Sequence, residues 1–186
     1  MSNDAHRAPG GPSPDVGDPS PDVDAHTPDA HTPDDARPED LAPVDDVAPP
    51  DGDDSTVALE WRGRVTNDEI NVLHAEAFEH RVLDDDWLTP LTTLSLGWVT
   101  ARDEDGLVGF VNVIWDGGVH AFVEDTAVAE RVRRRGIGRR LIAVAREHAT
   151  AAGCEWLHVD FDDHLRSFYF DACGFAPTNA GLMRLQ

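Results

Sequence analysis

A basic, glycine-bearing segment lies between an apolar stretch and a run of apolar residues at helical spacing. The segment is Arg133–Gly138 (RRRGIG); the stretch before it ends at Val128, and the helical pattern covers Leu141–Ala149. This order predicts a strand, a turn and a helix. Glycines let the backbone approach a phosphate, and a helix start offers unpaired N–H groups at the positive end of its dipole. Arginines add charge in a geometry that suits phosphate. We therefore expect a ligand that carries a pyrophosphate.

Two other phosphate-binding motifs do not fit this segment. A P-loop needs Gly-Lys-Ser/Thr, and the chain contains no lysine. A dinucleotide fingerprint needs a first glycine that is missing here, and no repeated β-α-β pattern follows. Taken alone, the hexapeptide also fits a plain connection with solvated arginines.

The spacing of this segment carries a resemblance to a known family. Arg133-x-x-Gly136-x-Gly138, five residues after Val128, resembles motif A of the Gcn5-related N-acetyltransferases, whose ligand is acetyl-coenzyme A. Three further segments match the family: the acidic strand end Glu124-Asp125-x-x-Val128 of polyamine-type members, the next strand Trp156–Asp160, and the closing Phe168-Tyr169 with Cys173-Gly174-Phe175. The resemblance covers residues 57–186.

The resemblance implies where the coenzyme lies. Its pyrophosphate is expected on the glycine loop, and its pantetheine arm between two parallel strands that splay apart. The residues implied to bind it are Ala127, Val128, Arg133, Arg134, Arg135, Gly136, Ile137, Gly138 and Arg139. The backbone N–H of Val128 is implied to polarise the thioester carbonyl.

Two neighbouring carboxylates are candidates for acid–base chemistry. Transfer of an acyl group to an amine requires removal of a proton from the ammonium. Side chains of a regular strand alternate between faces, so Glu124 and Asp125 are expected to point to opposite sides. By resemblance, Glu124 is the base and Asp125 binds the amine or supports the structure. The alternative is that both are solvated charges at a strand end.

Tyr169 is the only tyrosine in the chain and a candidate general acid for the departing thiolate. Family members place this tyrosine four residues before the glycine of Gly174-Phe175, where this chain has Phe170. Either the helix contains an extra residue, or the acid is displaced by one position. A half-buried helical residue with a hydrated hydroxyl is the alternative.

The first 54 residues form a separate compositional region. They hold 11 of the 13 prolines, no aromatic residue of the Phe, Trp or Tyr type, and 15 acidic side chains against Arg7 and Arg37. Such a segment cannot bury enough apolar surface to offset its chain entropy, so residues 1–54 are expected to be a disordered acidic tail and residues 55–186 the domain.

The remainder is acidic too, with 21 acidic residues against 13 arginines. This balance argues against binding to nucleic acids or anionic membranes. Absent lysine and abundant aspartate fit either a halophile or the codon bias of a GC-rich genome. Cys154 and Cys173 lack paired-ligand spacing, so we expect reduced thiols and no metal site. No apolar run of 18 residues or signal-peptide core occurs, which favours a cytoplasmic protein.

The order of predicted elements indicates an α/β (α+β) fold of the acyl-CoA N-acyltransferase type. It has a mixed, mostly antiparallel sheet of six to seven strands with helices on both faces. We expect strands at Val57–Val65, Trp98–Arg102, Leu107–Trp115, His120–Val128, Glu155–Phe161 and Gly181–Leu185, and helices after Thr66 and Asp84–Asp86 and over Gly138–Ala152 and His164–Cys173.

The sequence therefore predicts an N-acetyltransferase that transfers the acetyl group of acetyl-CoA, as co-substrate, to a primary amine of a small molecule or peptide. His80 and Asp84–Asp86 fall in the region that lines the acceptor pocket in the family, although N-capping of a helix explains the aspartates equally well. One alternative is a non-catalytic acyl-CoA-binding regulatory domain. Another is a phosphate-binding interaction module tethered by the acidic tail. The acceptor and the oligomeric state are not predicted.

Overall fold

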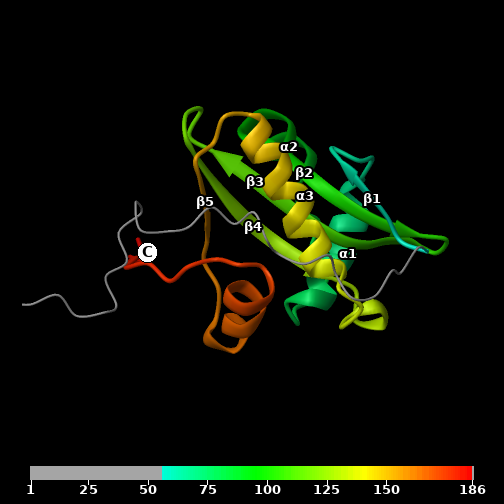
Figure 1. The fold of residues 1–186 in the computed structure, drawn as a ribbon. Coiled ribbons are helices and arrows are strands. Elements are labelled where there is room, and N and C mark those ends of the chain that lie inside the picture. Colours follow the sequence, from blue (N-terminus) through cyan, green and yellow to red (C-terminus); the bar gives the residue numbers. More distant parts are fainter. Residues whose placement is uncertain (1–55, 186) are drawn as a thin grey trace, which may run out of the picture. The chain divides into compact units, whose positions relative to one another are not determined.

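The computed structural model describes residues 56–185, so the predicted tail over residues 1–54 lies outside the described residues. Five strands and three α-helices form the described domain (Figure 1). In chain order they are β1 (Ala58–Trp61), α1 (Asn67–Ala77), α2 (Leu88–Leu94), β2 (Ser95–Asp103), β3 (Gly106–Trp115), β4 (His120–Val128), α3 (Ile137–Ala151) and β5 (Trp156–Val159). Short helical turns follow at Glu130–Val132 and Asp163–Leu165, with a π-helix at Ser167–Ala172.

The strands form one sheet in the order β1-β2-β3-β4-β5. The pairs β1–β2, β2–β3 and β3–β4 are antiparallel, and β5 is parallel to β4. A parallel neighbour requires a crossover connection, which α3 provides. The predicted mixed, mostly antiparallel sheet is thus confirmed.

The predicted number of strands is wrong, because the described residues form five strands and not six to seven. The expected last strand, Gly181–Leu185, has no regular structure. Its apolar side chains lie in solvent, with exposed fractions of 95% for Leu182, 79% for Met183 and 87% for Leu185. A strand needs a neighbouring strand and a packed face to be stable. Within the described domain this segment pairs with no strand and buries none of its apolar side chains, so the alternating pattern alone does not produce a strand.

Helices cover both faces of the sheet, since neighbouring residues of a strand point to opposite sides. On β3, a Cβ added at Gly109 would lie 3.1 Å from Leu141 of α3. The next residue, Phe110, has its ring centroid 6.4 Å from that of Trp87, which also contacts His74 of α1. Thus α3 covers one face, and α1 with the start of α2 covers the other (Figure 1).

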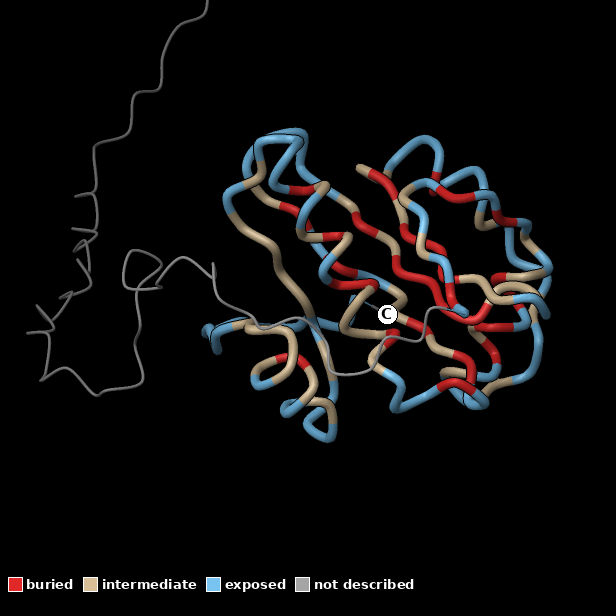
Figure 2. Tube along the Cα trace, turned by 45° about the vertical axis from the view of Figure 1, so that its right-hand side comes forward, coloured by how far each residue is buried: buried red, intermediate tan, exposed pale blue. Residues whose placement is uncertain are grey.

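The core is formed by the central strands together with the inner side of α3 (Figure 2). Val99, Val111, Val113 and Leu141 are completely buried. Burial of each such side chain contributes about 1.5–3 kcal/mol to the stability of the fold. Because β4 pairs along its length with the buried strand β3, the core determines the position of β4.

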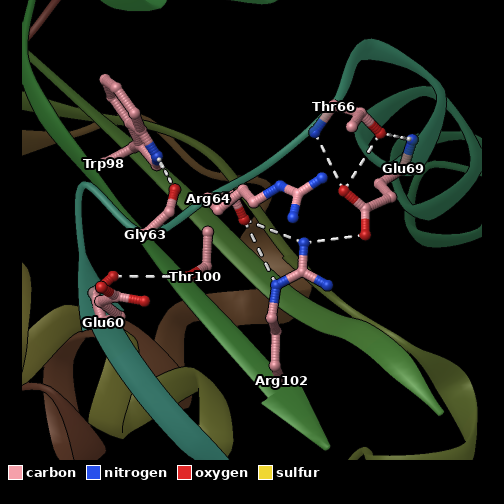
Figure 3. Close-up of polar contacts among 8 residues, drawn as sticks. All are labelled: Glu60, Gly63, Arg64, Thr66, Glu69, Trp98, Thr100 and Arg102. Atoms are coloured by element: carbon pink, nitrogen blue, oxygen red, sulfur yellow. Dashed lines mark hydrogen bonds and ion pairs between the residues drawn. The ribbon is translucent and has the colours of Figure 1, made fainter.

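The start of α1 is attached to β2 by a network of polar contacts (Figure 3). Thr66 and Glu69 form the predicted capping box: the Thr66 hydroxyl accepts from the Glu69 N–H at 3.2 Å, and the Thr66 N–H donates to Glu69 Oε2 at 2.9 Å. Arg102 of β2 donates to Glu69 Oε1 at 2.8 Å and to the Arg64 carbonyl at 2.9 Å. This network fixes the position from which α1 extends across the sheet.

Candidate active site

The parallel strands β4 and β5 separate before β4 ends. Their last paired residues are Val123 and Val159. β5 ends there, whereas β4 continues through Glu124 to Val128. Among the described residues, this stretch of β4 therefore has no strand partner on its β5 side. The pairing thus ends in the region where the family resemblance implied that the two parallel strands splay apart.

A β-bulge interrupts β4 in this unpaired stretch. Glu124 pairs with Asn112, but Ala127 pairs with Phe110, so two residues of β4 lie opposite one residue of β3. The two residues opposite Val111 of β3 are Asp125 and Thr126, and Asp125 has a left-handed backbone with φ of +53°. Such a conformation is uncommon outside glycine and is tolerated best by Asn and Asp. The bulge changes the direction of the side chains that follow Glu124.

The bulge places both carboxylates on the face of the sheet that α1 covers. Glu124 shares the face of its partner Asn112, and Asn112 alternates in phase with Phe110, which faces Trp87. Asp125 reaches the same face, because its Oδ1 lies 3.5 Å from His74 Nε2 of α1. The expectation that the two side chains point to opposite faces is wrong. The alternation rule holds only for a regular strand, and the bulge breaks it.

The environment of Glu124 favours its protonated form. Desolvation raises the pKa of this carboxyl, and the charges of Asp125 and Asp160 raise the pKa further. The residue as a whole is exposed to solvent, so the carboxylate is accessible although its hydration is incomplete. A carboxyl with a raised pKa beside other carboxylates is a stronger base than an ordinary glutamate.

Asp125 is less exposed than Glu124 and has a specific partner. Burial raises the pKa of Asp125, whereas His74 opposes that rise. Burial in turn lowers the pKa of His74, and the charge of Asp125 opposes that fall. Burial thus brings the pKa values of Asp125 and His74 closer together. Sequence inspection missed His74, because it lies on another element and no local motif marks it.

Tyr169 lies on the π-helix Ser167–Ala172 and is only 5% exposed. The Cys173 N–H donates to the Phe168 carbonyl at 3.0 Å, a contact that spans five residues. A π-helix accommodates one more residue in a turn than an α-helix. The helix therefore contains an extra residue, which is the first of the two predicted alternatives.

The phenol of Tyr169 faces the unpaired end of β4. Its ring stacks on Phe161 with centroids 4.6 Å apart. Burial raises the pKa of the phenol. The nearby Thr126 hydroxyl acts in the opposite direction and lowers it, although the two hydroxyls do not form a hydrogen bond of standard geometry. The Thr126 hydroxyl is buried without a hydrogen-bond partner among the described residues. The hydroxyl groups of Tyr169 and Thr126 thus both lie where β4 has no neighbouring strand.

The predicted glycine loop leads directly into α3. Gly136, the residue before the helix, has φ of +76°, and Arg134 has φ of +66°. Within the described residues, no side chain caps the start of α3. Arg133 donates from Nε to the Val128 carbonyl at 3.1 Å, so the loop folds back on the end of β4. The first N–H groups of α3 therefore have the geometry for binding an anion.

Gly138 brings three predicted segments together. A Cβ added at this residue would lie 3.1 Å from the Phe168 ring and 3.7 Å from Val128 Cγ2. The start of α3 therefore packs against both the end of β4 and the π-helix. A small pocket nearby is lined by Arg139, Ile142, Ala143, Arg146, Ala172 and Cys173.

The other predicted candidates are distributed unevenly around this site. His80 hydrogen bonds to His74 and so joins the carboxylate cluster. Asp84, Asp85 and Asp86 are all exposed in the loop before α2. Asn71 of α1 donates to the Asp85 carbonyl, and Asn67 donates to the Asp86 carboxylate.

The comparison with known families agrees with this geometry. Residues 61–175 match the acetyltransferase (GNAT) family, and this chain belongs to that family. The match begins in β1 and ends just after the π-helix, so it includes every part of the site described above. No curated protein matches the chain significantly.

Solved structures of similar fold are distant in sequence. A protein of unknown function from meticillin-resistant Staphylococcus aureus is 21% identical, with a TM-score of 0.59 over 70% of this chain and 98% of that chain. An aminoglycoside acetyltransferase from a soil metagenomic sample, in complex with sisomicin, is 19% identical, with a TM-score of 0.59 over 72% and 97%. AAC(6′)-Iy, in complex with the bisubstrate analogue CoA-S-monomethyl-acetylneamine, is 19% identical, with a TM-score of 0.57 over 70% and 97%.

Two further properties concern the described residues only. None of their helices is both long and apolar enough to span a bilayer. Nor do they contain a group of three or more His, Cys, Asp or Glu side chains arranged to hold a metal ion.

Proposed function

We propose that this chain transfers the acetyl group of acetyl-coenzyme A to a primary amine. The observation that carries this proposal is the unpaired end of β4. There, Glu124 and Asp125 share one face at the point where the sheet opens toward the glycine loop. Membership of the acetyltransferase family supports acetyl transfer in general. The acceptor class and the roles of individual residues are inferred from the geometry.

The coenzyme fits the loop and the uncapped start of α3. Backbone N–H groups at Gly136, Ile137 and Gly138 would bind the pyrophosphate, since a helix start favours anions. Gly136 adopts a left-handed backbone, which glycine accommodates without strain. Gly138 packs tightly against Phe168, since an added Cβ would lie 3.1 Å from that ring, and this packing holds the start of α3 beside the π-helix.

The two acid–base roles follow from proton affinity. Glu124 would accept a proton from the ammonium, because its raised pKa makes it a stronger base while it stays accessible. Tyr169 would donate a proton to the departing thiolate. Burial raises the pKa of its phenol, so the hydroxyl keeps its proton at neutral pH and can share it with the thiolate as the carbon–sulfur bond breaks.

The acceptor is proposed to be a cation. The carboxylates of Glu124, Asp125 and Asp160 are close enough to affect one another electrostatically. A cationic ammonium would relieve their mutual repulsion on binding. Two of the structural neighbours are in complex with sisomicin or with CoA-S-monomethyl-acetylneamine, which makes amino sugars a first class to test.

A steady-state assay of thiol release from acetyl-CoA with a panel of primary amines tests the proposal. We expect turnover with at least one amine and a large loss of turnover in Glu124→Gln. Glu147→Gln is the matched control, because Glu147 is an exposed glutamate on α3. Direct calorimetric titration with coenzyme A, and with ATP for comparison, measures binding separately.

The outcomes separate the alternatives. Tight binding of coenzyme A without turnover on any amine would favour a non-catalytic acyl-CoA-binding domain. Equal binding of coenzyme A and ATP would favour a general phosphate-binding module. Turnover that is unaffected by Glu124→Gln would overturn the assignment of the base.

A further inference from the structure

A chain of three contacts leads from Asp125 away from the end of β4. Asp125 Oδ1 lies 3.5 Å from His74 Nε2. His74 Nδ1 lies 2.7 Å from His80 Nε2, and His80 Nδ1 lies 2.7 Å from the Arg81 carbonyl oxygen. Each imidazole is therefore contacted through both of its nitrogens. The chain begins at a half-buried carboxylate and ends at the carbonyl of Arg81, which is an exposed residue.

The last contact fixes the tautomer of His80. A carbonyl oxygen only accepts hydrogen bonds, so His80 Nδ1 must hold a proton. If His80 is neutral, its Nε2 is then a lone pair that accepts from His74 Nδ1–H. A neutral His74 with its proton on Nδ1 has a lone pair at Nε2, and this lone pair faces the Asp125 carboxylate.

The group cannot satisfy its contacts with two neutral histidines and an ionised aspartate. One contact would always oppose two lone pairs, either between His74 and Asp125 or between His74 and His80. A single extra proton removes the conflict. It can be bound by Asp125, His74 or His80, and in each case all three contacts become favourable without movement of a heavy atom.

The surroundings favour transfer of that proton along the chain. Burial lowers the pKa of His74 and raises the pKa of Asp125, which brings their proton affinities together. The charge of Asp85 raises the pKa of His74, whereas the neighbouring His80 lowers the pKa of His74. On β4, the charge of Asp125 raises the pKa of Glu124. The His74 ring contacts the rings of Phe78 and Trp87, with centroid distances of 4.3 and 5.0 Å.

We propose that Asp125, His74 and His80 form a proton relay from the acceptor site to solvent at the α1–α2 loop. This inference rests on the proposed function. When an ammonium is acetylated, the nitrogen–carbonyl carbon bond forms and the carbon–sulfur bond breaks. The nitrogen loses two protons, of which one ends on the thiolate and the other must leave the protein.

The relay accounts for the second proton. The proton reaches Asp125 directly or from its neighbour Glu124. Because the chain of contacts already holds one extra proton, His80 releases its Nδ1 proton to water as Asp125 receives one. His80 is then protonated at Nε2. It returns to the Nδ1–H form when water adds a proton at Nδ1 and removes the one at Nε2, so one proton leaves the protein in each cycle. His74 and His80 are positioning residues in this scheme, since neither contacts the reacting atoms.

The kinetic test uses His80→Gln, which retains a hydrogen-bond acceptor for His74 but does not conduct a proton. With an amine that the parent acetylates, we expect turnover in about 1 mM buffer to fall at least about fivefold. Imidazole at high concentration should restore it, because a diffusible base replaces the missing group. A role in packing alone would give a loss that imidazole does not restore, and this result would overturn the relay.

The protein contains a matched control pair. His120 Nδ1 lies 2.8 Å from His158 Nε2, a contact of the same kind between β4 and β5. His158→Gln removes a histidine from this pair, which is not part of the contacts that lead from Asp125. Its turnover should show no dependence on imidazole. Equal rescue of both variants would indicate a general effect of buffer and would contradict the proposal.

A second test requires no substrate and so remains valid if the proposed function fails. Nitrogen-15 NMR of the histidine rings should find His80 with its proton on Nδ1. Asp125→Asn should lower the pKa of His74, and His80→Gln should raise it, because these neighbours act on His74 in opposite directions. An Nε2–H tautomer of His80, or a His74 pKa that neither substitution changes, would overturn the relay.

Discussion

The carboxylate of Asp125, in the bulge of β4, lies 3.5 Å from Nε2 of His74 on α1. Three elements of the chain lie between that helix and that strand. The contact exists because the bulge turns Asp125 toward the same face of the sheet as Glu124. The acid–base properties of the site therefore depend on backbone geometry as well as on residue type.

Introducing a negative charge into the glycine loop should abolish binding of coenzyme A. Gly136→Asp places a carboxylate where the pyrophosphate is proposed to bind, and the start of α3 would then bind its own side chain. We expect the affinity measured by calorimetry to fall at least about a hundredfold. Gly117→Asp is the control, because Gly117 has a similar φ of +79° in a turn away from the loop. Unchanged affinity in Gly136→Asp would mean that the ligand binds elsewhere.

Glu124→Gln should lower kcat by about 10²–10⁴-fold, the usual cost of losing a general base. The Michaelis constant for acetyl-CoA should change little. The variant should recover partly as pH rises, since more of the amine is then already neutral. This recovery is read from kcat measured across a neutral-to-alkaline pH series. A uniform loss at every pH would contradict the role of Glu124 as base.

The stability of the same variant should depend on pH in a defined direction. A carboxyl whose pKa is raised on folding contributes its stability below its unfolded pKa and loses it as pH rises through the folded pKa. The neutral amide of Glu124→Gln mimics the protonated carboxyl at every pH. The melting temperature of the variant should therefore match that of the parent in acid, below the unfolded pKa of Glu124, and exceed it in mild alkali. The opposite trend would mean that the pKa is lowered.

Tyr169→Phe should reduce turnover without changing the affinity for coenzyme A, because only the hydroxyl is removed and the ring contact with Phe161 remains. Thiol release and calorimetry measure the two effects. Phe170→Leu is the control, since the Phe170 ring packs 5.2 Å from that of Phe161 and has no ionisable group. It should affect melting temperature and leave the shape of the pH profile unchanged. Full activity of Tyr169→Phe would require another acid or none.

Cys173 should be a poor nucleophile in the folded protein. Burial raises the pKa of its thiol to about 11, so only about a thousandth of it is ionised three pH units lower, in mild alkali. We expect iodoacetamide in mild alkali to label Cys173 at an appreciable rate only after unfolding in denaturant. Mass spectrometry of digests identifies the labelled cysteine. Rapid labelling of native Cys173 would show that the thiol is accessible and ionised.

Several features of the domain followed from short stretches of sequence. The capping box at Thr66 and Glu69, the glycine loop before α3 and the hairpin of β2 and β3 all involve residues close together in the chain. Their conformations are favoured by local backbone preferences and hydrogen bonds. These segments were sufficient to predict the family and the order of the elements around the site.

Other features were decided by tertiary structure. No sequence pattern indicated the bulge at Asp125, because a bulge is defined by the register against β3. The sequence allowed either an extra residue in the helix around Tyr169 or a displaced acid, and the hydrogen bond from the Cys173 N–H to the Phe168 carbonyl decides for the extra residue. The alternating residues of Gly181–Leu185 predicted a strand, but a strand forms only where a partner is present.

The sequence by itself thus determined which residues could form the loop, the acidic strand end and the closing helix. Only the tertiary structure decided that Asp125 meets His74 and that burial changes the pKa values of Glu124, Asp125 and His74. The physical reason is the distance along the chain over which each interaction acts. Backbone preferences act over a few neighbouring residues, whereas desolvation and ion pairing depend on every segment that packs around a group.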